Sequence, residues 1–496
     1  MADESSLEIV GEGVLKWNNL RTSSSHPVSI DLSDADFRGR DLAGINFEQT
    51  TLTGADLRGA TLTKANCSWA DLSNAHLERA NLSRAVFGEQ GKGANLQGAN
   101  LREAILRDCN LTGITGLQPK QLAGADLTGA TLPGPLADLF KELHAVGDVS
   151  ESARKLFIAM VAACVYSWLT IATTTDLNLI TNRASSPLPI IQTSIPIVGF
   201  YVVAPLLLLC VYFYFHFYLQ KLWEELGSLP AIFPDGQRLH ERSDPWLWND
   251  LVRSHVTLLK GDRPFMSYFQ QAISIVLPWW LVPITLFLFW GRYLPRHDFD
   301  WTTLQVILLA ISIAGAVRLY RLAAATLRGD PRRSFFGIRT LVTLRAYGAS
   351  ATFVVTGAAF MLVSIGAIRG VPQYEYPWWR EGPPGAWGWV PRAMALVHYS
   401  PFANLRQADV SVKPPNWTGK SASELDLVKG AELSRPSLGH PSEGADLRYA
   451  DALQAFLAKA NLENARLEDA QLSFANLTGA DLRNANLTGA TLVMRT

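Results

Sequence analysis

The sequence predicts a fold in three parts: a four-sided β-helix at each end and a bundle of membrane-spanning α-helices between them. Two observations support this. A large apolar residue recurs at every fifth position near both ends of the chain, and the middle consists of long apolar segments. A period of five matches neither a helix, at about 3.6, nor a strand, at about 2, so it indicates a repeat architecture.

The first array places Leu or Phe at every fifth position, with Ala two residues earlier in most repeats. If the backbone turns a corner in each repeat, four corners close a square coil, and successive coils stack at roughly 4.8 Å. The large residue and the Ala then both point into a narrow core that admits nothing larger at the Ala position. The slots of the large residue are Leu32, Phe37, Leu42, Phe47, Leu52, Leu57, Leu62, Cys67, Leu72, Leu77, Leu82 and Phe87.

Two irregularities interrupt this array. Phe87 and Leu96 are nine residues apart, across a Gly-rich stretch at 88–93. We interpret the stretch as a bulged loop on one coil; the alternative is a loop that binds a partner, since functional loops often project from rigid scaffolds. The period then slips by one before Leu117 and continues to Leu132.

The second array runs from Leu447 to Leu492, with Ala in every minus-two position. Ala403-Asn404-Leu405 and Ala408-Asp409-Val410 look like two more repeats ahead of a Pro-interrupted stretch at 413–419. We therefore predict five regions: a polar N-terminal segment at 1–29, a β-helix at 30–134, a transmembrane domain at 135–370, a Trp- and Pro-rich linker at 371–430, and a second β-helix at 431–496.

The repeat reads Ala, then Asp or Asn, then Leu, then two variable residues, and so resembles the pentapeptide-repeat family over 31–132 and 445–494. The resemblance implies a right-handed quadrilateral β-helix. The whole architecture looks like that of bacterial membrane proteins with such repeats. The resemblance implies no activity, because solenoids are surfaces to which functions are added.

The charge of the array argues against one function that occurs in this family. Some pentapeptide-repeat proteins imitate DNA with a strongly acidic solenoid and bind DNA gyrase. Residues 31–132 carry twelve acidic and ten basic side chains, and the whole chain has 44 of each. This balance argues against DNA mimicry, and no nucleic-acid partner is expected.

Five apolar segments in the middle of the chain are long enough to span a bilayer, which takes about 20 residues. A buried all-α soluble core is the alternative, and five such segments in one block make it the weaker interpretation. The predicted spans are 156–175, about 195–219, about 270–291, about 303–324 and about 349–368.

Loop charge predicts the orientation, because loops rich in Lys and Arg stay in the cytoplasm. The basic loops are 220–268 and 325–345, whereas 176–194 carries Arg183 alone. No apolar signal-peptide segment opens the chain. We therefore expect a cytoplasmic N-terminus, and the resemblance to bacterial proteins implies that the membrane is a bacterial inner membrane.

Five spans place the second array on the opposite side of the membrane. Trp378, Trp379, Trp387 and Trp389 in the segment 371–402 are typical of the headgroup zone there. An even number of spans would instead let the short second array stack on the first, which would favour its stability. We predict five spans.

No catalytic residue, cofactor site or metal site is predicted, because no P-loop, GxSxG, HExxH or strand-associated GxGxxG occurs. His216 lies within a span and is a functional candidate for that reason, but a structural His near the interface is favoured. Phe233-Pro234-Asp235-Gly236 predicts a turn. Residues 245–260 have apolar side chains at helical spacing, which fits either a helix on the membrane surface or one packed on protein.

The leading hypothesis is a membrane-anchored protein-interaction scaffold that presents the repeat solenoids, with the lipid bilayer and an unidentified protein as partners. The alternative is a membrane channel or transporter with solenoid accessory domains. That alternative is weakened by the scarcity of polar residues in the spans. An enzyme is the least supported class, because no site is evident.

Overall fold

We describe a computed structural model of the 496-residue chain. The structure describes residues 3–23, 29–88, 93–141, 144–182, 185–187, 194–242, 248–259, 265–328, 346–369, 394, 399–419, 421–437 and 440–493. The chain divides into two compact units. The first comprises Met1–Phe157, Tyr214–Trp279 and Arg318–Thr343, and the second comprises Ile158–Phe213, Trp280–Val317 and Leu344–Thr496.

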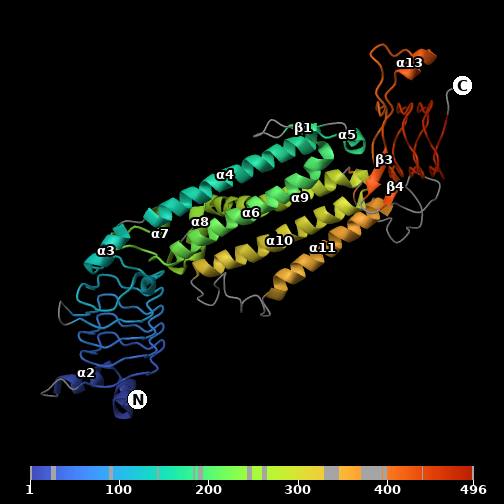
Figure 1. The fold of residues 1–496 in the computed structure, drawn as a ribbon. Coiled ribbons are helices and arrows are strands. Elements are labelled where there is room, and N and C mark those ends of the chain that lie inside the picture. Colours follow the sequence, from blue (N-terminus) through green and yellow to red (C-terminus); the bar gives the residue numbers. More distant parts are fainter. Residues whose placement is uncertain are drawn as a thin grey trace. The chain divides into compact units, whose positions relative to one another are not determined.

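In the first unit, a β-helix is formed by the repeats between residues 31 and 132 (Figure 1). The residue before each slot forms a parallel bridge with the residue 20 positions later, as in Thr61 with Asn81, so four five-residue sides make one coil. Pairing consists of one isolated bridge per side and not of extended strands. Leu62 donates its N–H to Asn81 O at 2.7 Å, and Asn81 donates to Ala60 O at 2.9 Å.

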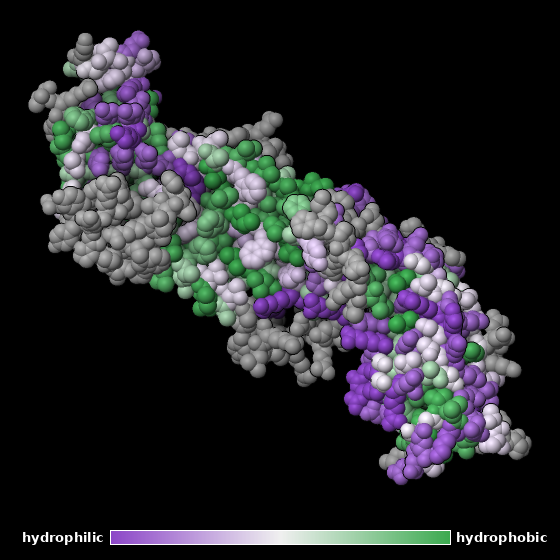
Figure 2. All heavy atoms as spheres, turned by 180° about the vertical axis from the view of Figure 1, so that it is seen from behind, coloured by the Kyte–Doolittle hydropathy of each residue, from purple (hydrophilic) through white to green (hydrophobic). Residues whose placement is uncertain are grey.

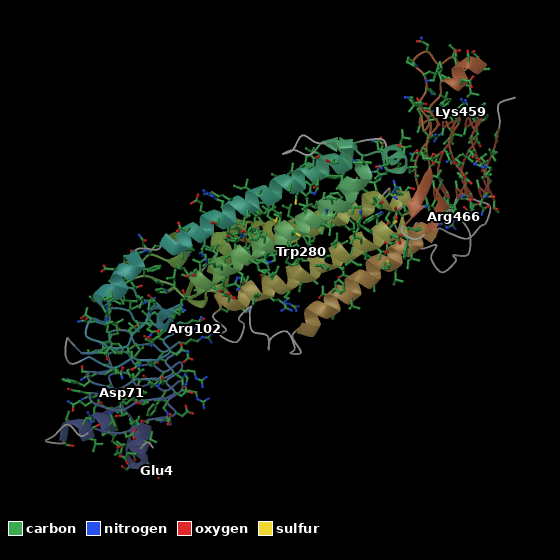
Figure 3. The ribbon with its side chains drawn as sticks, viewed as in Figure 1. Glu4, Asp71, Arg102, Trp280, Lys459 and Arg466 are labelled. Atoms are coloured by element: carbon green, nitrogen blue, oxygen red, sulfur yellow. The ribbon has the colours of Figure 1, made fainter. Side chains whose placement is uncertain are left out.

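Corners of the coil depend on two local features. The residue two after each slot adopts a positive φ, for example 71° at Gly54 and 57° at Lys64, and this left-handed residue turns the chain. Asp or Asn before the slot accepts the N–H two residues later, as Asp71 does from Ser73 at 3.1 Å. These features explain the Asp and Asn preference in the sequence. The outward side chains are mostly polar, as at Asp71 (Figure 3).

The predicted inward slots from Leu32 to Phe87 are all buried, which confirms the period-five assignment. The prediction that Leu117 points into the core is wrong. A short 3-10 helix, η1 (Pro119–Leu122), brings Leu122 into the core, while Leu117 is half-buried. Gln121 compensates for the irregular backbone, because its Nε2 donates to Leu96 O and Ala99 O at 2.7 Å each.

The Gly-rich interruption leaves the stacking intact. Ala94 donates its N–H to Phe87 O at 2.9 Å, and Asp71 pairs with Asn95, 24 residues on. The ladder therefore continues across the interruption. The predicted bulged loop falls on residues 89–92, which lie outside the described part.

Cys67 occupies a slot between two aromatic ones. The bridges Asn46–Asn66 and Asn66–Val86 place Phe47, Cys67 and Phe87 in one column on successive coils. All three side chains are buried. A small residue between two large ones keeps the column at the volume that the narrow core allows. Burial raises the pKa of the Cys67 thiol to about 12, so it stays protonated and behaves as a small hydrophobe.

The N-terminal segment, predicted only to be polar, forms two helices that close the first coil: α1 (Glu4–Glu12) and α2 (Val14–Ser23). Trp17 is fully buried against Phe47, and its Nε1 donates to Asn46 O at 2.7 Å. Asn18 bonds Gly44 O and the Asn46 N–H at 2.9 and 2.8 Å. These contacts provide the terminal cap that a solenoid needs.

The last coil of the same β-helix is closed by a segment from far along the chain. Ala231-Ile232-Phe233 follows a helix and imitates one repeat, with Ala231 and Phe233 fully buried. Leu127 donates to Ile232 O and Gly129 to Pro234 O at 3.0 Å each, as between ordinary coils. The predicted turn at 233–236 is confirmed, and it belongs to this added rung.

The helices of the middle region agree with the predicted spans. Five are long and apolar enough to cross a membrane: Val146–Thr173, Ile197–Gly227, Tyr268–Arg296, Phe299–Leu327 and Ala351–Ile368. They correspond to α4 (His144–Thr173), α6 (Ile197–Gly227), α9 (Phe265–Tyr293) with η4 (Leu294–Arg296), α10 (Phe299–Leu327) and α11 (Ala346–Arg369). Apolar side chains lie on the outside of these helices, Trp280 on α9 among them (Figures 2 and 3).

Short elements precede or connect these helices. They are α3 (Gly134–Lys141), α5 (Asp176–Thr181), the antiparallel pair β1 (Ser185–Pro187) and β2 (Ser194–Pro196), α7 (Leu239–Arg242), α8 (Asn249–His255) and η3 (Thr257–Leu259). Near the C-terminal repeats lie α13 (Ala422–Asp426) and the antiparallel pair β3 (Ser434–Ser437) and β4 (His440–Gly444).

In the second unit, the C-terminal repeats form a β-helix with the same 20-residue pairing, as in Asn461 with Asp481. It begins earlier than the predicted boundary at 431. Asn404 pairs with Asp451 and Asp409 with Phe456, so the two repeats at 403–410 are its first sides. Leu405 and Val410 are buried in its core with Leu433, Leu447 and the later slots up to Leu472.

Candidate functional site: a polar junction at the base of the C-terminal β-helix

Arg292, at the end of α9, joins two helices to the first coil of the C-terminal β-helix. Its Nε and Nη2 donate to Thr174 O at 3.0 and 2.7 Å, and Nη1 donates to Asp176 Oδ1 at 2.6 Å. Thr174 follows the last turn of α4, where carbonyls lack intrahelical donors and a cation is favoured. Asp176 Oδ2 in turn accepts the Asn404 N–H at 2.7 Å.

Helix α5 supplies the apolar part of the same junction. Asp176 is its first residue, and Thr175 caps it by accepting the Asn178 N–H at 3.2 Å. Leu177 and Ile180 pack against the core of the C-terminal β-helix. Helix α5 therefore contacts the C-terminal β-helix through apolar side chains and, at Asn404, through a charged one.

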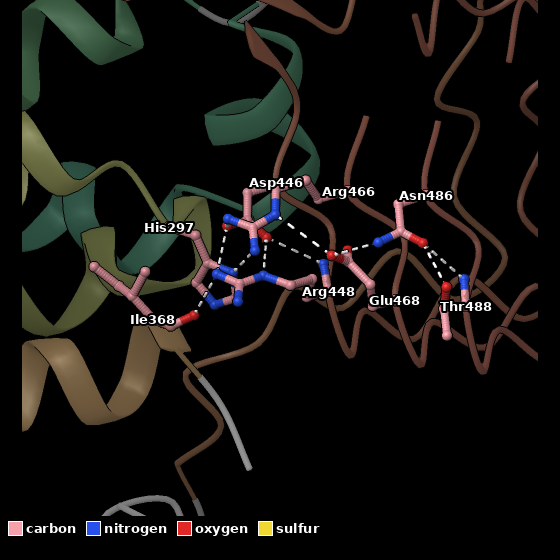
Figure 4. A network of polar contacts seen from close by, with 8 residues as sticks. All are labelled: His297, Ile368, Asp446, Arg448, Arg466, Glu468, Asn486 and Thr488. Atoms are coloured by element: carbon pink, nitrogen blue, oxygen red, sulfur yellow. Dashed lines mark hydrogen bonds and ion pairs between the residues drawn. The ribbon is translucent and has the colours of Figure 1, made fainter. Parts of the chain in front are cut away.

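A second cluster lies around Asp446 (Figure 4). Arg448 donates from Nε to Asp446 Oδ1 at 2.9 Å and from Nη2 to Oδ2 and to Ile368 O at 2.7 Å each. His297, which follows η4, has Nδ1 at 3.4 Å from Asp446 Oδ1 and Nε2 at 3.1 Å from Pro401 O. His297, after α9, contacts the Asp446 carboxylate directly, and the end of α11 is joined to it through Arg448.

The cluster continues along the outside of the β-helix. Arg466 lies 3.8 Å from Asp446 and 3.5 Å from Glu468. Asn486 Nδ2 donates to Glu468 Oε1 at 3.0 Å, and Asn486 Oδ1 accepts the Thr488 N–H at 3.1 Å. Side-chain contacts thus link three successive coils of the C-terminal β-helix, beginning at Asp446.

Asp446 is the most strongly perturbed carboxyl of this cluster. Burial alone would raise its pKa, but hydrogen bonds from His297 and Arg448 and their charges hold the pKa well below its ordinary value of 3.8. A depressed folded-state pKa contributes stability above the unfolded value, and that stability is lost as the pH falls through the folded value.

We expect the docking of the C-terminal β-helix to weaken progressively as the pH falls below about 4, because the Asp446 carboxylate then gains a proton more easily in the undocked state. Hydrogen exchange of the Asn404 amide, which donates to Asp176 Oδ2 across the junction, measures this against pH. Asp446→Asn should weaken docking at neutral pH and flatten the acid dependence. An unchanged acid profile in that variant would assign the effect to other carboxyls.

The described residues that the sequence analysis singled out as candidates are buried in the protein. His216 is buried with its ring 5.7 Å from that of Trp279, which favours the structural interpretation. Trp248, Leu251 and Val252 around α8 are buried in protein, so the interpretation of 245–260 as a helix packed on protein is confirmed for its described part. The Trp residues at 378–389 lie outside the described residues.

The chemistry that this junction supports is ion pairing and backbone capping. Within the described ranges, no group of three or more His, Cys, Asp or Glu side chains could hold a metal ion. Sequence reasoning missed Arg292, His297, Asp446 and Arg448. The one feature of the sequence that could have pointed to this junction is the presence of two arginines, Arg292 and Arg296, directly after the predicted span 270–291.

Comparison with protein families finds a match to the family described as pentapeptide repeats, in eight copies at residues 30–66, 65–87, 92–114, 443–473 and 465–494. The search of curated proteins finds no match.

Three solved structures show what the repeats are similar to. The pentapeptide repeat protein Rfr23 from the cyanobacterium Cyanothece 51142 is 34% identical over 23% of this chain and 61% of its own, with a TM-score of 0.14. A pentapeptide repeat protein of the Arabidopsis thaliana thylakoid lumen is 31% identical over 20% and 72%, with a TM-score of 0.12. One from Nostoc PCC 7120 is 30% identical over 21% and 88%, with a TM-score of 0.15.

Proposed function

This chain belongs to the pentapeptide-repeat family, and from that premise we propose that it is a membrane-anchored scaffold whose N-terminal β-helix binds a protein partner on one lateral face. The support is the form of that β-helix. Both of its ends are closed by the chain's own residues, Trp17 at one and Phe233 at the other. Its four sides are therefore the surface available to a partner.

One side of this β-helix carries exposed apolar side chains. Trp69 is 47% and Val86 53% exposed, and they are the large exposed apolar residues among the described residues of the array at 29–132. The bridge between Asn66 and Val86 puts both on the side of slots 67 and 87. An exposed Trp and an exposed Val on the same side of an otherwise polar array are typical of a binding hot spot. This pair carries the proposal.

Charged side chains on another side of the array are mixed in sign. Asp36, Arg38, Asp56 and Arg58 form an alternating ladder there, with contacts of 2.5–3.7 Å. Such exposed pairs contribute little stability, and they leave no strongly acidic or basic stripe. The apolar pair, and not net charge, is therefore the feature that a partner would recognise.

Trp69→Ala should weaken partner capture at least tenfold, because truncating a central aromatic anchor removes most of the contact energy. Cross-linking and co-purification of the full chain from native membranes measure this. Lys64→Ala is the matched control: Lys64 occupies the equivalent corner one repeat earlier, with φ 57° against 60° at Trp69.

A specific partner that depends on Trp69 and not on Lys64 supports the proposal. Equal capture by wild type and Trp69→Ala contradicts the assignment of the face. Absence of any specific partner for the wild-type chain in its native membranes contradicts the scaffold itself.

We further propose that the five apolar helices span a bacterial inner membrane, with the N-terminal β-helix in the cytoplasm. Lys221 near the end of α6, together with Arg238, Arg242 and Arg253 between α6 and α9, supports this orientation, since basic loops are retained on that side. An odd number of spans then places the C-terminal repeats outside. A reporter active on one side of the membrane, fused after residue 496, tests it; a cytoplasmic C-terminus contradicts five spans.

A further inference from the structure

Three arginines lie on one face at the end of α10. Arg318 precedes Arg321 by three residues, and Arg328 follows Arg321 by seven, which is close to two helical turns. Arg328 directly follows the helix and continues its pattern, because its N–H donates to Ala324 O at 3.2 Å. All three side chains are exposed, and none has an ion pair or a side-chain hydrogen bond with another residue in the part of the chain that the structure describes. We call Arg318, Arg321 and Arg328 the arginine face.

Two other faces of α10 are turned toward protein. Thr326 Oγ1 accepts a hydrogen bond from Gln220 Nε2 of α6 at 2.9 Å. The ring of Tyr320 lies 5.5 Å from that of Trp279 on α9 and 6.1 Å from that of His255, the last residue of α8. At about 3.6 residues per turn, these two contact directions leave one sector of the helix, and the arginines lie in it. The exposed charges are therefore directed away from α6, α8 and α9.

Two contacts between α6 and α10 fix which residues of these helices lie at the same level. Tyr201 O accepts a hydrogen bond from Gln305 Nε2 at 3.1 Å, and the two residues are 104 positions apart in the sequence. Gln220 and Thr326, which form the other contact, are 106 positions apart. This nearly constant separation means that the two helices run in the same direction, with their levels matched along their length.

Arg318 and Arg321 lie at the level of exposed aromatic side chains. By the separation of the contacting pairs, Arg318 is level with Tyr214 and Arg321 with Phe217, which are 51% and 48% exposed. An exposed Tyr at the level of Arg or Lys is typical of the zone of lipid headgroups. The length of α10 leads to the same depth, because about 20 residues counted from Phe299 cross the apolar core and end near Arg318. The two measures agree in placing the arginine face among the headgroups.

An exposed guanidinium at this depth needs an anion, because a charge beside the apolar core is costly unless it reaches a partner. We propose that Arg318 and Arg321 bind the phosphate of one anionic phospholipid in the cytoplasmic leaflet. This inference rests on the proposed insertion of the helices in a membrane. Guanidinium groups recognise phosphate through paired N–H donors, and side chains three residues apart on a helix are neighbours that can share one phosphate.

The charge of the site favours an anionic lipid over a zwitterionic one. A choline or ethanolamine headgroup brings its own cation, which the arginine face repels, whereas a glycerol headgroup brings none. An acidic protein segment is the competing occupant. The lipid is favoured because Arg318 and Arg321 lie at the level of the exposed aromatic side chains, where the phosphates of the bilayer are the anions within reach.

A photo-cross-linker at the arginine face tests the proposal. Ala324 lies three residues after Arg321 and four before Arg328, so p-benzoylphenylalanine in its place in the full chain projects from the same face. In vesicles of equal parts dioleoyl phosphatidylglycerol and dioleoyl phosphatidylcholine, the mass of the adduct identifies the captured lipid. We expect phosphatidylglycerol to be captured about twentyfold more often, because each basic residue at an anionic surface contributes about fivefold.

Replacing the arginines should remove this preference. Arg321→Gln should lower it about fivefold, and Arg318→Gln combined with Arg321→Gln should bring it to near unity. Lys221→Gln is the matched control, because it removes an exposed charge near the end of α6 and not from the arginine face. It should change the preference by less than about twofold.

The outcomes separate this site from the proposed membrane insertion. Equal capture of the two lipids overturns the site and leaves the insertion intact, whereas no lipid adduct at all contradicts both. A preference that survives the double replacement, or that falls as far in Lys221→Gln as in Arg321→Gln, reflects general attraction to the surface and overturns the site. In native membranes, an adduct with a second protein in place of a lipid assigns the face to an acidic partner and also overturns it.

Discussion

Replacing Arg292 with Ala should release the base of the C-terminal β-helix. The guanidinium donates to Thr174 O and Asp176 Oδ1, and Asp176 holds the Asn404 amide. Its removal leaves a largely buried carboxylate and a helix-terminal carbonyl without their donor. We expect a loss of about 2–4 kcal/mol in the docking free energy, since breaking one side of a buried charged pair is costly.

Hydrogen exchange in lipid nanodiscs measures this loss as a rise of about thirtyfold to a thousandfold in the exchange rate of the Asn404 amide. The amide of Leu457, inside the array, should change far less. Arg406→Ala is the matched control, because Arg406 is exposed and should alter docking by less than about 0.5 kcal/mol. If Arg292→Ala exchanges like Arg406→Ala, the junction is held by the apolar contacts of α5 alone.

Replacing Cys67 with Leu should destabilise the N-terminal β-helix, although Leu is the residue that the repeat most often places in this slot. Phe47 and Phe87 occupy the same column on the coils before and after it. Additional carbons between two phenyl rings force neighbouring side chains or backbone to shift, at a cost of about 1–3 kcal/mol. Exchange rates of the amides of Cys67 and Ala70 measure the effect.

A compensating change separates overpacking from loss of the thiol. Phe87→Leu in the Cys67→Leu background reduces the neighbouring volume, so the double variant should be more stable than the sum of the two single changes predicts. Cys67→Ala should cost less than Cys67→Leu. A Cys67→Leu variant as stable as wild type would show that the column has spare volume.

The parts of the fold that depend on local periodicity were predictable from the sequence. The slots from Leu32 to Phe87 and the five apolar helices follow from patterns that many residues share, so no single residue decides the prediction. The structure agrees with them at nearly every position. Leu117 fails because it adjoins a slip in the period, where the pattern no longer determines which residue turns inward.

The parts that depend on single residues were not predictable. Trp17 is one of several apolar residues in the segment 1–29, and nothing in its sequence neighbourhood indicates that it caps the first coil. Phe233 belongs to an isolated repeat in which Ile232 replaces the usual Asp or Asn. From the sequence alone, the segment 233–236 therefore predicts only a turn. His297 and Asp446 are 149 residues apart and share no motif. Such long-range contacts leave no periodic trace in one sequence.

The added rung at 231–235 has a consequence for the order of events during synthesis. Leu127 and Gly129 receive their last backbone partners from Ile232 and Pro234, roughly a hundred residues later. At translation rates of roughly 5–20 residues per second, the repeats wait on the order of ten seconds for that segment. During this interval two apolar helices, α4 and α6, leave the ribosome. Completion of the N-terminal β-helix thus follows the synthesis of α4 and α6, and until residues 231–235 have been made its last coil presents a β-edge without these partners.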